Sequence, residues 1–222
     1  KGGGAAVAGG GADLPQQGAD LMPRTAVCVD IFQNAGPEYR VDTPARASAW
    51  GFTIKSAKEM AAERFSGHVA PRFIYRMAQS ENLLPFVLGV HRAPLALPAI
   101  RAAGGTWSIL DETEIRRQGF TQTARRFAAI DQKLKTVGKG KTLQQRIDER
   151  GKLSKQVFGA AGHLILAGAG GKIVCAACIP VAQAQDLVVD QTLYWKVVAD
   201  ADEAWYQVGM LNSVALTNAT LA

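Results

Sequence analysis

The stretch that decides the fold is DQTLYWKVVADADEAWYQVGMLNS, at residues 190–213 in the last quarter of the chain. Its apolar, β-branched run at 193–198 is typical of a strand. After an acidic corner, Ala204, Val208 and Leu211 recur at helical spacing. Carboxylates are favourable at a helix N-terminus, so the corner marks the start of that helix. The stretch therefore predicts a strand that leads directly into a capped helix.

The segment before it predicts a β-hairpin. HLILAGAGGKIVCAACIP, at 163–180, contains two apolar runs on either side of the small residues 168–171. A dinucleotide-binding loop would also place glycines after a strand, but such a loop opens a helix. Here strand-forming residues follow at 172–175. We therefore favour a hairpin turn over a nucleotide site.

The first half of the chain predicts a succession of short strands. GADLMPRTAVCVDIF, at 18–32, indicates a turn and then a strand with Val27, Val29 and Ile31 on one face. Residues 68–100 alternate apolar runs with four prolines, which exclude long helices and central strands. Further short strands are expected at 39–43, 51–55 and 106–110, and a short helix at 55–65.

Between these β-rich parts, the sequence predicts a helical hairpin. Asp111 and Glu114 have about the spacing of a capping box, and so do Thr142 and Gln145. Apolar residues recur near the helical period after each box. A Gly-Lys-Gly-Lys sequence separates the two periodic segments and breaks the helix. We expect two helices over about 112–158, joined at a basic tip.

The positive charge of the chain is concentrated in this hairpin. Twelve basic and three acidic residues lie between positions 116 and 155, a net charge of +9, whereas the whole chain carries +6. A local patch of this kind suits a polyphosphate partner such as DNA. The alternative is a solvated helical face, and the charge alone leaves both open. The candidate phosphate-binding residues are Arg116, Arg117, Arg125, Arg126, Lys133, Lys135, Lys139, Lys141 and Arg146.

Two arginines outside the hairpin are further candidates for DNA contact. DNA recognition needs cations that neutralise phosphates and groups that read base edges. Arg24 and Arg72 each follow a proline at a predicted strand edge, an arrangement that would fix the side chain well. The alternative for each arginine is a structural ion pair.

The composition indicates a globular domain. The chain has 222 residues, of which 48% are hydrophobic, and no apolar run approaches the length of a membrane helix. Residues 1–17 are rich in Gly and Ala and are expected to form a linker. The first residue is Lys1 and no signal peptide is recognisable, so we expect the chain to come from a longer polypeptide.

Cysteine usage indicates reduced thiols and a cytoplasmic protein. There are three cysteines, and two of them form a C-x-x-C at Cys175 and Cys178. This pair lies in strand-like sequence, where residues three apart face opposite sides. Such a pair does not close on one metal ion, so we favour buried apolar cysteines over a zinc or redox site.

Catalytic motifs are not recognisable in the sequence. No elbow of the G-x-S-x-G type occurs, and the three histidines are far apart and next to apolar residues. The acidic trio Asp200, Asp202 and Glu203 could be a metal site, but we favour a helix N-terminus, where carboxylates are stabilising. We expect no catalytic residue and no metal site in this chain.

Four phrases, in this order, resemble the C-terminal specificity region of N6-adenine DNA methyltransferases of the type IIG-like restriction–modification class. None of them is long, and together they span most of residues 18–213. They are GADLMPR at 18–24, RFIYR…LLPF at 72–86, the hairpin with small residues and Ala-Ala at 163–177, and YW…EAWY…LNS at 194–213.

The resemblance implies a DNA target recognition domain, at 18–222, with an α+β fold. This fold would be a β-rich recognition domain of short strands with an inserted basic helical hairpin and a C-terminal helix. Such a domain clamps double-stranded DNA and presents one adenine, flipped out of the duplex, to a methylase domain of the same parent polypeptide. That catalytic domain would use S-adenosylmethionine. Its adenine-gripping Asn/Asp-Pro-Pro-Tyr/Phe motif is missing here, because the sequence has no Pro-Pro pair.

A protein-interaction or assembly domain of a multi-subunit restriction–modification system is the alternative. In that case the helical hairpin would pair with a partner helix. A hairpin of this kind should carry an unbroken heptad seam and charges of both signs. The broken seam and the net charge of +9 favour DNA instead.

Overall fold

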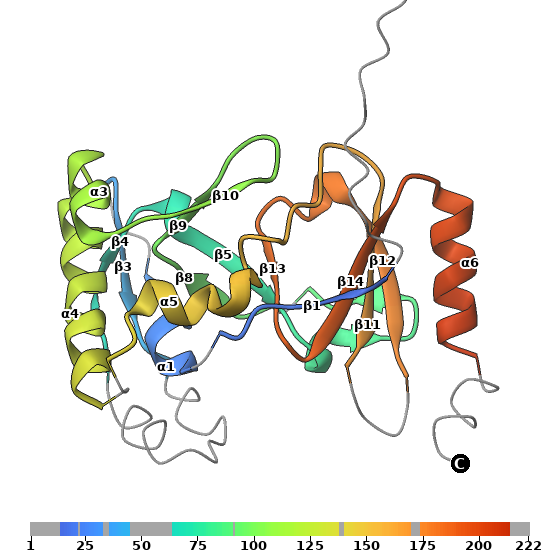
Figure 1. Ribbon diagram of the computed structural model, residues 1–222, viewed down its shortest axis with the longest axis horizontal. Coiled ribbons are helices and arrows are strands. Elements are labelled where there is room, and N and C mark those ends of the chain that lie inside the picture. Colours follow the sequence, from blue (N-terminus) through green and yellow to red (C-terminus); the bar gives the residue numbers. More distant parts are fainter. Residues whose placement is uncertain are drawn as a thin grey trace, which may run out of the picture.

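The computed structural model confirms a mixed α+β fold built from several small sheets. It describes residues 14–21, 23–32, 36–44, 64–90, 92–137, 140–169 and 174–213. The expected strand at 51–55, nearly all of the helix at 55–65 and most of the Gly/Ala-rich linker lie outside these residues. Figure 1 shows helices α3 and α4 at one end of the molecule, α6 at the other end, and the strands between them.

The end that contains α6 is a four-stranded antiparallel sheet with a helix on one face. The strand order is β1-β14-β11-β12, and α6 packs on β11 and β12. The Asp200 carboxylate accepts a hydrogen bond from the Glu203 backbone N–H at 2.8 Å and caps α6. The predicted strand, capped helix and β-hairpin are therefore confirmed. The elements are β1 (Gln16–Gln17), β11 (His163–Gly168), β12 (Ala176–Pro180), β14 (Leu193–Val198) and α6 (Ala201–Leu211).

The two faces of this sheet carry separate apolar clusters. On the inner face, Trp195 packs edge-on against Phe158, with ring centroids 5.2 Å apart. On the outer face, Cys178 packs with Val208 and other buried residues of α6. Cys175 contacts the inner cluster, so the two cysteines of the C-x-x-C contribute to opposite faces. The interpretation of this motif as apolar packing is confirmed.

Short strands fill the middle of the molecule, as predicted, but the expectation that the prolines at 68–100 exclude central strands is wrong, because β5 fits between two of them without containing a proline. Strand β5 is central in a three-stranded sheet, parallel to β13 and antiparallel to β8. Pro94 opens the edge strand β8, a position that a residue without an N–H tolerates. These strands are β4 (Gly67–Val69), β5 (Ile74–Ala78), β6 (Leu83–Leu84), β7 (Val87–Leu88), β8 (Pro94–Ala96), β9 (Ala99–Arg101), β10 (Trp107–Ile109) and β13 (Leu187–Val189).

The predicted strand in 18–32 is shorter than expected. A helical turn, α1 (Arg24–Val27), precedes it, and only β2 (Asp30–Phe32) is a strand, paired with β3 (Tyr39–Asp42). Val27 therefore lies in the turn and not on a strand face. The turn is closed by the Cys28 N–H, which donates to the Arg24 carbonyl at 2.7 Å. All four residues of the turn are buried, so tertiary packing overrides the strand preference of its β-branched residues, Thr25 and Val27.

Both predicted capping boxes are present, but the second helix is much shorter than expected. The elements are α3 (Glu112–Arg117), α4 (Thr121–Val137) and α5 (Leu143–Ile147). Gly119 has a φ of +90° and separates α3 from α4. The expectation that a helix continues to about 158 is wrong. The Asp148 carboxylate accepts the N–H groups of Leu153 and Ser154 at 2.9 and 2.8 Å, which turns the chain away from the helix.

The segment that follows α5 joins the two ends of the molecule. The Gln156 side chain is buried and pairs with the Val189 backbone, donating to its carbonyl at 2.8 Å and accepting its N–H at 2.9 Å. The Gln156 carbonyl also accepts the Trp107 indole N–H at 3.2 Å. A glutamine amide thus replaces a strand partner along the edge of β13.

A buried ion pair fixes the N-terminal part of the chain to the C-terminal sheet. Arg24 on α1 contacts Asp190, which follows β13, at 3.3 Å, and the Asp190 side chain is fully buried. Gly18 lies against the same residue. A Cβ atom at Gly18 would lie 2.3 Å from the Asp190 carbonyl oxygen, so only glycine fits. The ion-pair alternative for Arg24 is therefore confirmed.

Removal of this carboxylate should strongly destabilise the fold. We expect Asp190→Ala to lower the free energy of unfolding by about 3–5 kcal/mol, because it leaves the Arg24 guanidinium buried without its counter-ion. Asp186→Ala is the matched control, because its ion pair with Arg76 is half exposed. It should cost less than about 1 kcal/mol. Denaturant unfolding measures both, and equal losses would contradict this assignment.

Candidate nucleic-acid interface

Seven of the predicted phosphate-binding residues lie on a helical unit of α3, α4 and α5, of which α3 and α4 form one end of the molecule and α5 lies toward its middle. Leu143 at the start of α5 donates its N–H to Asp131 of α4 at 2.7 Å, and α3 packs along α4. The helices are therefore held as one unit, whose position is visible in Figure 1. We define the basic surface as Arg116, Arg117, Arg125, Lys133, Lys135, Lys141 and Arg146.

Three cations of the basic surface are engaged in ion pairs, two of them half exposed on both sides and the third made to the Asp131 carboxylate, which is 17% exposed. Arg116 pairs with Glu112, Lys135 with Asp131 at 2.9 Å, and Lys141 with Glu149 at 3.2 Å. Exposed pairs of this kind contribute little free energy, so a phosphate competes with them easily. Arg117 and Arg125 are exposed and have no ion-pair partner among the described residues. The basic surface is therefore available to a polyanion.

Arg126 does not belong to this surface, which corrects its prediction as a DNA contact. Its side chain is 3% exposed and packs against Gly67 of β4, where an added Cβ would lie 3.2 Å from the Arg126 Cβ. Burial lowers the pKa of Arg126 to about 10, and nearby Asp42 opposes this shift. None of its guanidinium nitrogens has a hydrogen-bond acceptor among the described residues.

The remaining predicted residues have different environments. Arg24 is buried in its ion pair with Asp190, so it is also withdrawn from the DNA-binding set. Lys139 lies outside the described residues. Arg72 is exposed, as a DNA contact requires, and its guanidinium lies 5.5 Å from the ring centroid of Phe120, just before α4. Arg72 therefore stands between the basic surface and the central strands.

The structure reveals one arginine that supports the fold and was not predicted. Arg101 lies between two rings, 4.2 Å from the centroid of Trp107 and 4.7 Å from that of Phe158. It donates to the Ala184 carbonyl at 3.1 Å, and burial lowers its pKa to about 10. Burial also raises the pKa of neighbouring Tyr75 to about 12. No local motif marks Arg101, because its partners lie far away in sequence.

A concave site with two further arginines lies among the central strands. We call it the arginine pocket. It has a volume of about 490 Å³, and Arg76 and Arg92 lie in its wall with Asp186. The other walls come from β2, β3, β5 and β8, including Ile31, Tyr39 and Ile74. Sequence reasoning missed both arginines, although Arg76 ends the RFIYR phrase at 72–76.

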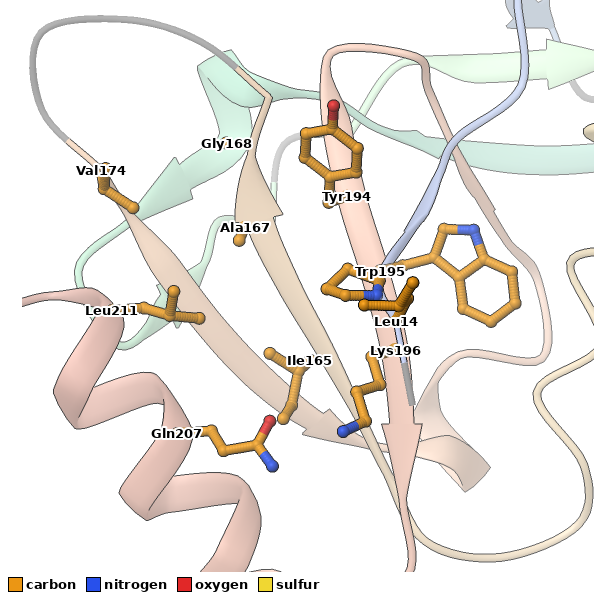
Figure 2. Close-up of a pocket in the computed structure, with 11 residues that line it drawn as sticks. Leu14, Ile165, Ala167, Gly168, Val174, Tyr194, Trp195, Lys196, Gln207 and Leu211 are labelled. Carbon is orange, nitrogen blue, oxygen red and sulfur yellow. The ribbon is translucent and has the colours of Figure 1, made fainter. Parts of the chain in front are cut away.

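A second concave site, of about 520 Å³, lies on the outer face of the four-stranded sheet. Figure 2 shows Ile165 and Ala167 between Gln207 and Leu211 of α6 on one side and Leu14 on the other. We call this site the apolar groove. Lys196 is its one cationic residue among those that line it. Exposed Tyr194, Tyr206 and Met210 on β14 and α6 add apolar surface at this end of the molecule.

The acidic trio and the other potential metal ligands do not form a metal centre in the described part of the chain. No group of three or more His, Cys, Asp or Glu side chains suited to a metal ion occurs among the described residues. Asp200 of the acidic trio caps α6, and the other two members lie in its first turn. Among the described helices, none is long and apolar enough to cross a membrane.

Comparison with known proteins gives no assignment. No protein-family model matches the chain, and none of the curated proteins is significantly similar to it. The resemblance to the specificity regions of adenine methyltransferases therefore stays a prediction from the four phrases.

Because Arg126 is buried and Arg125 is exposed, we expect their replacement by methionine to affect the stability of the protein differently. We expect Arg126→Met to raise the free energy of unfolding by about 1–4 kcal/mol near neutral pH, because it removes a buried charge without an acceptor. The folded-state pKa of Arg126, about 10, is below the ordinary value for arginine, so the folded protein loses this proton at a lower pH than the unfolded chain. The free energy of unfolding of the wild type therefore rises relative to that of Arg126→Met as the pH rises through about 10. The difference in stability between the two proteins narrows accordingly.

Denaturant unfolding at about pH 8 and about pH 11 measures this effect. Arg125→Met is the control, because an exposed side chain should change stability by less than about 0.5 kcal/mol. A clear loss of stability in Arg126→Met would show that Arg126 has a stabilising partner.

Proposed function

We propose that this chain is a sequence-specific DNA-binding domain of an N6-adenine DNA methyltransferase. It would position the target adenine for a catalytic domain outside this chain. The observation that carries the proposal is the basic surface, seven cations on the helical unit of α3, α4 and α5, within a sequence segment (116–155) whose net charge is +9. The order of the four family-like phrases supports the methyltransferase context.

The proposed mechanism is positional. Cations of the basic surface bind phosphates on the duplex, which fixes the register and orientation of the domain but carries no sequence information. Other groups read base edges, and one adenine is turned out of the stack toward the methylase. S-adenosylmethionine would bind to the methylase domain. The proposed location of the whole protein is the cytoplasm, where its three cysteines remain free thiols.

The slope of DNA affinity against salt concentration tests this proposal. Each phosphate that the protein neutralises contributes about 0.9 to the slope of log affinity against log salt. We expect a steep slope for the wild-type chain on a fluorescent duplex. Replacement of Lys133, Lys135, Lys139 and Lys141 with alanine should lower the slope by about 0.9 for each phosphate that these lysines neutralise.

Lys196→Ala is the control for a simple loss of charge. Lys196 lies in the apolar groove, on the sheet at the other end of the molecule, and its replacement should leave the slope unchanged. Equal effects of the two variants would contradict a specific role for the basic surface. Absence of binding even at low salt would contradict DNA binding by this chain.

A second candidate function is assembly with a partner protein, which the apolar groove favours. Its occupant would be the methylase part of the parent enzyme. Leu14 and Pro15 form one wall of the groove, directly after the Gly/Ala-rich segment at 1–13, so a domain joined there would be held close by. Lack of DNA binding, together with methylase association that Ala167→Arg abolishes, would favour this candidate.

A further inference from the structure

The arginine pocket combines cations with apolar walls in a way that the basic surface does not. Ile31, Ile74 and two prolines form its apolar walls, and Tyr39 adds an aromatic ring. The charged groups, Arg76, Arg92 and Asp186, come from three separate segments of the chain. Apolar walls reduce competition from water, so hydrogen bonds made by these groups gain in strength and selectivity.

Arg76 is half exposed and has one charged partner in the pocket. It lies on β5, the middle strand of its sheet, and its backbone N–H donates to the Asp186 carbonyl at 2.8 Å. Its Nε pairs with the Asp186 carboxylate at 3.0 Å. Among the described residues, no hydrogen bond uses its two terminal nitrogens. Arg76 therefore presents the end of its planar fork, which suits an acceptor pair on a ligand.

Arg92 has one buried donor, its Nε, that lacks an acceptor among the described residues. It immediately precedes β8, and its side chain is half buried. A buried donor without an acceptor costs free energy, and a bound ligand with acceptor atoms would remove that cost. The pocket thus offers two guanidinium groups to one ligand.

The position of the pocket indicates which ligand this is. Pro71 lines the pocket, and the next residue, Arg72, lies 5.5 Å from the ring centroid of Phe120, which immediately precedes α4. The pocket and the basic surface are therefore connected through Arg72. A duplex that contacted both Arg72 and the basic surface would lie next to Pro71, which lines the pocket. Arginine pairs with the O6 and N7 atoms of guanine more often than with any other base edge.

We infer that the arginine pocket reads guanine in the target duplex, with Arg76 and Arg92 as specificity-determining residues. This inference rests on the proposed function and adds a division of tasks to it. The lysine-rich basic surface holds the backbone, and the two arginines distinguish base pairs. Asp186 is a positioning residue, because it orients Arg76 through their ion pair.

Selection from a library of random duplexes, followed by sequencing, tests the inference. The wild-type chain should enrich a short motif that contains at least one G·C pair. Arg76→Lys and Arg92→Lys keep the charge but lose the planar fork. Each should reduce discrimination at one guanine position by about 5- to 150-fold and leave the salt slope almost unchanged. Lys133→Ala with Lys135→Ala should instead lower the salt slope and retain the motif.

The outcomes separate this inference from the function on which it rests. If both arginine variants enrich the wild-type motif with unchanged discrimination, the inference is wrong and the proposed function stands. Binding of all duplexes equally by the wild type would also overturn it, because sequence would then not be read here. A wild-type chain that binds no duplex at low salt would overturn the proposed function as well. Denaturant unfolding of both variants confirms that they are folded.

Discussion

The buried ion pair between Arg24 and Asp190 is the contact on which the arrangement of this fold depends. It joins Arg24 in α1 to Asp190, which lies between β13 and β14, 166 positions further along the chain. Asp190 is fully buried, and beside it Gly18 leaves room for the chain to cross. Gln156 adds a second link by pairing with the backbone of Val189. These polar contacts in an apolar interior fix how the C-terminal sheet meets the central strands, because a buried charge without its partner is costly.

Positive charge has three separate roles in this molecule. Arg24, Arg101 and Arg126 are largely buried and belong to the packing of the fold. The cations of α3, α4 and α5 form the basic surface, where Arg116, Arg117, Arg125, Lys135 and Lys141 are exposed and Lys133 and Arg146 are half buried. Arg76 and Arg92 line a pocket with apolar walls, where guanidinium N–H groups can donate hydrogen bonds to a ligand. Net charge alone does not distinguish these roles, whereas burial and hydrogen-bond partners do.

Local features were predictable from the sequence, and long-range ones were not. Both capping boxes, the β-hairpin at 163–180 and the helix after Asp200 depend on neighbouring residues, so their patterns are visible in the chain. The second helix was overestimated because the side chain of Asp148 captures two backbone N–H groups and ends it. The burial of Arg126 was within reach, since Ile130 follows it by four residues on the apolar side of α4. Arg24, Arg76 and Arg101 meet partners more than eighty residues away, which one sequence does not reveal.

The most direct test of the central claim is a lysine-modification footprint on the wild-type chain with and without duplex DNA. Acetylation rates at individual lysines, measured by mass spectrometry, report which side chains the duplex covers. The account predicts slower modification of Lys135 and Lys141 on the basic surface and an unchanged rate at Lys196 in the apolar groove. Preferential protection of Lys196, or the same rates at all three lysines with and without DNA, would contradict the claim that the basic surface binds DNA.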